Sequence, residues 1–173
     1  LSQCVLNNIP LESGQYGDSI VFNHGTKITK ELLKQNDIVL TYSNAMRGQV
    51  NDFYRLEFFG RERSDLPKTG VCFICRKNNW KRTIDRILYL TNGTAGDIEF
   101  IDDEYKKENQ MRIDFHPDFV PRGKRFKNID IDTEFLLADP GTPDPKQFNR
   151  LNKFEYAYAI TTHLSQGSQY NRV

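Results

Sequence analysis

The segment DIVLTYSNAMRGQVNDFYRLEFFG, residues 37–60, carries most of the fold information in the first part of the chain. It opens with a short apolar run, DIVLTY, which is typical of a strand buried on both faces. Ser43 or Asn44 can cap a helix that keeps a helical apolar period to about Phe59, where Gly60 supplies the stop. A buried strand followed by a helix indicates an α/β domain.

The residues before this segment predict one further strand and one further helix. SIVF, at residues 19–22, is expected to form a short strand, and Thr26 can cap a helix through ITKELLKQ, residues 28–35. Because this helix leads into a buried strand, we expect parallel strand pairing. We therefore assign residues 1–60 to the first part of the α/β domain.

After residue 60 the pattern changes to short strand-like runs separated by Gly, Asn, Asp and Pro. These runs are VCFIC, ILYL, GDIEFI, MRIDF and TEFLL. Short strands at close spacing favour a small all-β barrel, which we place as an insert at residues 61–146. The turn-rich DPGTPDPK then leads to FEYAYAITTH, so residues 147–173 are expected to return to the α/β domain.

The composition fits one domain with an insert and excludes several classes of protein. The chain has 173 residues, of which 38% are apolar, so we expect it to fold. Its 24 Lys and Arg nearly balance 23 Asp and Glu, so attraction to nucleic acid must come from local patches. An odd number of cysteines indicates a reducing compartment, the cytoplasm. No run approaches the ~20 apolar residues that span a bilayer, so no membrane partner is expected.

One segment carries a candidate ligand site: YAYAITTHLSQGSQYN, residues 156–171. A β run precedes small hydroxyl side chains, an imidazole and a glycine, which can donate to a phosphate or ribose and let it approach closely. The same residues also suit an ordinary strand-to-helix turn with Thr and Ser as caps. Their spacing alone leaves both interpretations open.

Three stretches in order resemble motifs of superfamily-one DNA helicases, closest to the RecD-like and Dda-like branch. YAITTHLSQGSQYNRV, residues 158–173, resembles the fifth motif, A-x-T-x-H-K-S-Q-G-S-E-F. VLTYSNAMRGQVNDFYR, residues 39–55, resembles the fourth motif, T-N-x-x-x-x-x-x-N-x-x-x-R. TGVCFICRKNN and YLTNGTAGDI resemble the G-D-x-V-x-x-x-x-N-N and N-G-x-x-G-x-V pair of the inserted barrel. The resemblance implies an incomplete second RecA-like domain interrupted by a small barrel of the Src-homology type.

The resemblance also implies roles for individual residues. It places at single-stranded DNA the residues Thr161, His163 and Asn51. It places in the nucleotide cleft between two RecA-like domains the residues Asn44, Arg55, Gln166, Gly167 and Gln169. No catalytic residue and no metal ligand is expected within this chain.

The chain departs from the motifs at three positions. Leu164 stands where the family has Lys, Gln169 stands where it has Glu, and Val71 follows Gly70 directly, so the Asp of G-D-x-V is missing. A neutral Gln lacks the charge-assisted hydrogen bond of a carboxylate, so we expect weaker or less selective nucleotide binding.

Motifs needed for ATP hydrolysis are absent from the sequence. It has no G-x-x-x-x-G-K-[ST] phosphate loop and no acidic Mg²⁺-binding motif, and the family's arginine motif would follow Val173. We therefore expect a fragment of an ATP-dependent DNA helicase, a hydrolase that uses ATP and Mg²⁺ only as the intact parent. Its expected partners are single-stranded DNA and the first RecA-like domain of the same polypeptide. The alternative is a non-catalytic nucleic-acid or protein interaction module with a helicase-like shape.

Basic residues gather around aromatic residues within the expected insert. Residues 61–127 hold 15 Lys and Arg against 11 Asp and Glu, with clusters around Trp80 and Phe126. Cations interleaved with an aromatic ring suit single-stranded nucleic acid, so Trp80 and Arg82 are candidate DNA contacts. The alternative is a solvated face with Trp80 packed in the core.

The remaining candidate side chains favour structural roles. Cys72 and Cys75 form a C-x-x-C, but no second pair completes a zinc site, so we expect buried or half-buried structural thiols. His24 and His116 lie near no nucleophile or carboxylate pattern, so we expect both at the surface.

Overall fold

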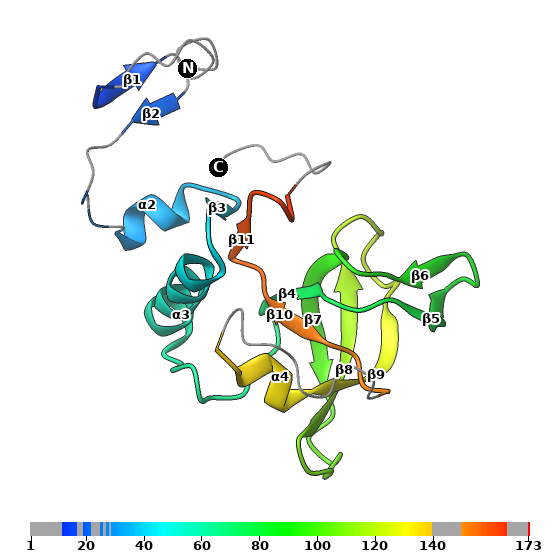
Figure 1. Ribbon diagram of the computed structural model, residues 1–173. Helices are drawn as coiled ribbons and strands as arrows, with labels where there is room; N and C mark the ends of the chain where they lie inside the picture. Colours follow the sequence, from blue (N-terminus) through cyan, green and yellow to red (C-terminus); the bar gives the residue numbers. More distant parts are fainter. Residues whose placement is uncertain are drawn as a thin grey trace.

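In the computed structural model, most residues of the chain are described (Figure 1). These are residues 12–16, 19–21, 25, 27, 29–139, 150–165 and 173. Several predictions fall outside them, namely those on Thr26, His24, Gln166, Gly167 and Gln169.

The α/β part consists of two parallel strands and a long helix. Strand β3 (Val39–Thr41) pairs in parallel with β11 (Ala159–Thr161), and helix α3 (Asn44–Phe59) packs against both. The Ser43 hydroxyl caps α3 by accepting from the Met46 N–H at 3.2 Å. Gly60 ends the helix in the left-handed region, at φ 60°, which glycine adopts without strain. The predicted strand, helix, cap and stop are confirmed.

Two smaller elements precede this unit. Helix α2 (Lys30–Lys34) is shorter than predicted, and its cap is Thr29, whose side chain accepts from the Leu32 N–H at 3.2 Å. Strands β1 (Gly14–Tyr16) and β2 (Ser19–Val21) form an antiparallel hairpin. The expected strand at residues 19–22 is therefore present as the second arm of a hairpin, with Phe22 outside the described residues.

A five-stranded antiparallel sheet forms the larger part of the molecule. Its strand order is β10-β4-β7-β8-β9. The strands are β4 (Cys72–Cys75), β7 (Ala95–Ile101), β8 (Gln110–Pro117), β9 (Phe126–Asp132) and β10 (Phe154–Tyr156). Strand β10 pairs with β4, so this sheet includes residues from the segment expected to return to the α/β part.

The expected closed barrel is not present among the described residues. Strands β5 (Asn79–Ile84) and β6 (Leu88–Leu90) pair only with each other, as a hairpin that projects beside β8 and β9 (Figure 1). Within the described residues, the β9 edge meets the chain before β10 only around Asn152, through a parallel bridge to Ile131 and a hydrogen bond from Asn152 Nδ2 to the Asp130 carbonyl oxygen at 2.8 Å. The five-stranded sheet therefore stays open.

Within the expected insert, the sequence interpretation also misassigned one strand and missed two. TEFLL forms helix α4 (Thr133–Leu137) instead of a strand, because Asp132 accepts from the Phe135 N–H at 3.1 Å and caps it. Strands β5 and β9 were not predicted. Both strands are rich in polar residues, and their pairing depends on partners elsewhere in the chain.

The structure has two apolar clusters, one in the five-stranded sheet and one in the α/β part, and strand β4 contributes side chains to both. Phe73 and Cys75 face the main apolar cluster, whereas Ile74 points the other way and packs with Ile38 and Ile160 of the α/β part. This follows from the two-residue period of a strand, which sends successive side chains to opposite faces. Strand β4 therefore packs against both parts of the molecule.

Gly96 allows strands β7 and β8 to approach each other. A Cβ at this position would lie 2.0 Å from the His116 carbonyl oxygen, so only glycine fits without a backbone shift.

Among the described residues, no helix is long and apolar enough to cross a membrane.

Candidate nucleic-acid interface

The carboxyl ends of the two parallel strands lie next to each other. The Thr162 N–H donates to the Thr41 carbonyl oxygen at 3.0 Å, just beyond the end of β11. The buried Thr41 hydroxyl donates to the Ile160 carbonyl oxygen at 3.3 Å, which ties the strand ends together. The turn after β3 and the turn after β11 therefore share one edge of this small sheet.

Among the described residues, four polar or aromatic side chains are exposed at this edge, which we call the carboxyl-end surface. It consists of Tyr42, Asn44, Thr162 and His163. Tyr42 is 94% exposed, so its ring has almost no contact with the protein. Helix α3 begins here as well, and the positive end of its dipole favours an anion nearby.

This arrangement suits a ligand that carries phosphates and rings. In open α/β sheets, ligands bind outside the carboxyl ends of parallel strands. Thr162 and His163 offer a hydroxyl and an imidazole, and the Asn44 amide offers N–H donors. Tyr42 offers a ring face for stacking, and no feature of the sequence had singled it out.

The predicted DNA contact Thr161 lies at the end of β11 and is half-buried, whereas His163, two residues later, is exposed. The Leu164 and Ser165 N–H groups both donate to the Thr161 carbonyl oxygen, at 2.9 and 3.1 Å. These bonds form a tight turn that holds His163 outward. The structure therefore brings His163 and Asn44 together at one edge, with Thr161 beneath them.

Asn51 lies in the interior, and its amide is occupied by the backbone. Its Nδ2 donates to the carbonyl oxygens of Tyr156 and Ala159, each at 3.1 Å. Its Oδ1 accepts from the Ala159 N–H at 2.8 Å. We therefore assign Asn51 to fastening α3 onto the chain between β10 and β11.

Arg55 is also buried and has its donors occupied. Its guanidinium donates to the carbonyl oxygens of Glu62 and Asp65, each at 2.7 Å, and stacks over the Tyr156 ring at 4.0 Å. These contacts hold the turn after α3, so Arg55 presents no donor to a nucleotide.

Trp80 is 63% exposed on β5, so the alternative that packs it in the core is wrong. It contacts the Tyr89 ring of β6 edge-to-face, with centroids 5.7 Å apart. Phe126, the other aromatic of the basic clusters, is fully buried in the core and offers no ring for stacking. Tyr89 was missed by sequence reasoning because only its pairing opposite β5 places it beside Trp80.

A solvent-open groove of about 380 Å³ lies between the β5–β6 hairpin and the turn before β9. Half of its lining residues are basic, namely Lys81, Arg82, Lys124, Arg125 and Lys127, and one is acidic, Asp85. Arg125 is compensated by Asp114 at 2.8 Å and Glu99 at 3.2 Å, and Lys124 pairs with Asp85. The remaining cations leave the groove positive.

The two cysteines of C-x-x-C are protonated structural thiols at neutral pH. Cys75 is buried and Cys72 is half-buried, as predicted. Burial raises the pKa of each thiol to about 11. Across the described residues, no group of His, Cys, Asp and Glu is arranged to hold a metal ion.

His116 was expected at the surface, and that prediction is wrong. It is buried on β8, with its ring nitrogens 3.3 Å from Asp97 Oδ1 and 3.2 Å from the Val120 carbonyl oxygen. Arg122 pairs with the same Asp97 at 3.1 Å, so this cluster fastens the turn after β8.

Comparison with known proteins gives no assignment, since no family model, curated protein or solved structure matches this chain.

Proposed function

We propose that the chain binds single-stranded DNA at the carboxyl-end surface, as part of an ATP-dependent DNA helicase of superfamily one. The observation that supports this proposal is the parallel pairing of β3 with β11. This pairing brings the two segments that resemble the fourth and fifth helicase motifs to one edge, although they lie far apart in the sequence. In this proposal β3, α3 and β11 belong to the second RecA-like domain.

The chemistry of the exposed side chains fits a single strand better than a duplex. A base can stack on the Tyr42 ring, and base–aromatic stacking contributes about 1–3 kcal/mol per base. Thr162 and His163 can donate to the adjacent phosphate oxygens. A duplex keeps its bases stacked on each other, so it offers no free base to Tyr42.

ATP and Mg²⁺ belong to the intact parent in this proposal. Of the described residues assigned to the nucleotide cleft, Arg55 does not fit, because its guanidinium is occupied by backbone carbonyl oxygens. Asn44 fits, because it is exposed beside the start of α3. The chain alone is expected to bind DNA without hydrolysing ATP.

A binding measurement on the full 173-residue chain tests this proposal. We expect a fluorescently labelled oligo-dT strand to show saturable anisotropy at low ionic strength, with affinity that falls as salt rises. Tyr42→Ala should weaken binding about fivefold or more, because it removes the stacking ring. His163→Ala should weaken it by a smaller factor, through the loss of one phosphate contact.

Phe100→Ala is the matched control, because Phe100 is an exposed aromatic on β7, away from the carboxyl-end surface. Its affinity should equal that of the unmodified chain. Absence of binding at low salt would overturn the proposal, and so would equal losses from Tyr42→Ala and Phe100→Ala.

A further inference from the structure

Strand β5 carries a bulge that includes an exposed tryptophan. Thr83 pairs with Tyr89, and Asn79 pairs with Leu90. Because Tyr89 and Leu90 are consecutive, the three β5 residues from Trp80 to Arg82 have no paired residue on β6. A bulge leaves the extra residues unpaired and redirects their side chains. Here the redirected residues are one aromatic and two cations.

The bulge is held by specific contacts. Asn79 Oδ1 accepts from the Lys81 N–H at 3.0 Å, and Asn79 Nδ2 donates to Asn152 Oδ1 at 2.7 Å. At the other end of the hairpin, Asp85 and Arg86 have positive φ, 53° and 61°, in a turn that the Ile87 N–H closes by donating to the Ile84 carbonyl oxygen at 3.1 Å. The hairpin is therefore fixed at its base and at its tip.

The Trp80 ring is exposed to solvent and is held by a neighbouring ring. Burying a tryptophan is one of the larger apolar contributions available to a core, yet Trp80 stays mostly in solvent. Tyr89, 41% exposed, supports Trp80 from one side through the edge-to-face contact. This support orients the Trp80 ring while much of the ring remains accessible.

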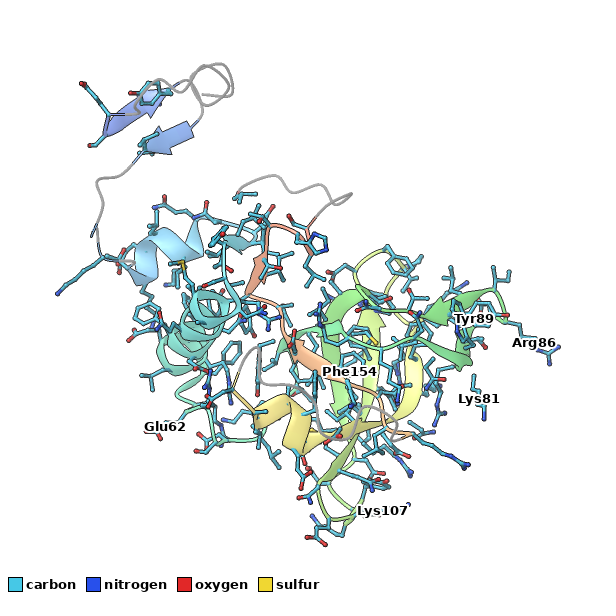
Figure 2. All side chains as sticks on the ribbon, viewed as in Figure 1. Glu62, Lys81, Arg86, Tyr89, Lys107 and Phe154 are labelled. Atoms are coloured by element: carbon cyan, nitrogen blue, oxygen red, sulfur yellow. The ribbon has the colours of Figure 1, made fainter. Side chains whose placement is uncertain are left out.

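The cations next to Trp80 lack acidic partners. Within the described part of the chain, Lys81 and Lys127 form no ion pair, and Arg82 donates only to the Lys127 carbonyl oxygen, at 3.5 Å. The neighbouring Lys124 and Arg125, by contrast, are paired with carboxylates. Figure 2 shows Lys81, Arg86 and Tyr89 on the outer side of the hairpin, away from Phe154 of the sheet.

We propose that the bulge and the groove beside it form a second contact for single-stranded nucleic acid, in which a base stacks on Trp80 and the adjoining phosphates bind Lys81, Arg82 and Lys127. The proposal takes its ligand class from the proposed function but uses a separate surface. A base between two phosphates matches a ring between cations, whereas an acidic peptide would use the cations and leave the ring free. A duplex would hide its bases from Trp80.

The intrinsic fluorescence of the chain reports on this contact directly, because Trp80 is the only tryptophan in the sequence. The experiment titrates the full chain with oligo-dT at low salt while recording both tryptophan emission and strand anisotropy. We expect saturable quenching of the emission as a base stacks on the ring. Trp80→Ala should weaken strand binding about fivefold or more.

Variants of the groove cations provide a second readout. Arg82→Ala and Lys127→Ala should each lower the slope of log affinity against log salt by about 0.7, the value for one phosphate contact on a single strand. Lys106→Ala is the matched control, because Lys106 is an exposed lysine on the turn between β7 and β8. It should leave the slope and the quenching unchanged.

The outcomes separate this inference from the proposed function. Strand binding that depends on Tyr42 but leaves the Trp80 emission unchanged overturns the inference alone. The inference is supported if Trp80 emission is quenched and if Arg82→Ala and Lys127→Ala lower the salt slope of the affinity. If Tyr42→Ala then has no effect on binding, the proposed DNA contact at the carboxyl-end surface is overturned. Absence of binding overturns both. Equal quenching by poly-glutamate also overturns the inference, because the groove would then be a general acidic-polymer site.

Discussion

The junction between α3 and the β10–β11 segment uses the same kinds of side chain as the β5–β6 hairpin, but in opposite ways. At the junction, Arg47 is buried against Glu155, and Tyr54 stacks on Tyr158 at 4.0 Å. At the hairpin, Arg82 has no acidic partner among the described residues, and Trp80 is exposed. Arginine and aromatic side chains in one region therefore indicate a binding surface only when the protein itself leaves both available.

The difference is one of desolvation. A buried cation has lost its water and depends on its protein partner, so its removal affects folding. An exposed cation keeps its water until a ligand arrives, so its removal affects binding and hardly changes stability. The two regions should therefore respond differently to the same substitution.

The largest effect is expected from Arg47→Ala. Arg47 Nη2 donates to Glu155 Oε1 at 3.0 Å, and Arg76 Nε also lies 3.1 Å from Glu155. Breaking a buried ion pair costs about 3–5 kcal/mol, and we expect the lower end because Arg76 stays with the carboxylate. Urea denaturation should show a loss of about 3 kcal/mol for Arg47→Ala and less than about 0.5 kcal/mol for Arg82→Ala. Equal losses would remove the distinction between the two regions.

A smaller effect is expected from Asn51→Ala. The substitution leaves two backbone carbonyl oxygens and the Ala159 N–H without their partner in the interior. We expect a loss of about 2 kcal/mol in the free energy of unfolding, within the range for unsatisfied buried groups. Asn44→Ala on the same helix is the control, because Asn44 is exposed, and it should change stability by less than about 0.5 kcal/mol. A neutral Asn51→Ala would contradict the structural role.

The smallest effect per side chain concerns the thiols of β4, the strand that packs against both parts. Burial raises the pKa of Cys72 and Cys75 to about 11 from the ordinary 9.0. Between pH about 9 and about 11 the unfolded chain releases thiol protons that the folded chain retains, so stability is full below this window and falls as pH rises. From pH 8 to pH 10 the expected loss is on the order of 1 kcal/mol for each of the two thiols.

Urea midpoints across this pH range check the thiol prediction. A Cys72→Ala, Cys75→Ala chain should show a flatter decrease, because it lacks the two titrating groups. If stability falls with pH as steeply in this variant as in the unmodified chain, the decrease belongs to other groups. Tyr156 is one such group, because burial raises its pKa to about 12.

Local signals in the sequence were sufficient for several elements. Helix α3 was predicted with its cap and its stop, because Ser43 and Gly60 act within one turn of the helix ends. The strand before it and most strands of the larger sheet were also predicted, from short apolar runs bounded by turn residues. TEFLL was misassigned because a five-residue apolar run has no clear period, and its cap lies outside the run.

The candidate sites were less predictable, because exposure depends on distant partners. Asn51 and Arg55 matched motif positions, yet Asn51 is occupied by residues more than a hundred positions away and Arg55 by the turn that follows its helix. Trp80 could be core or surface on composition alone. Its exposure follows from the bulge, which depends on β6 and on Asn152 across the sheet.

The sequence by itself determined the alternation of β3, α3 and β11, the balance of charge and the placement of basic residues near Trp80, because these depend on neighbours along the chain. Only the tertiary structure decided that the larger sheet stays open, that Asn51 and Arg55 face inward, and that Trp80 faces solvent. Strand pairing and burial are set by contacts between distant residues, and their free energy has no counterpart in any local pattern.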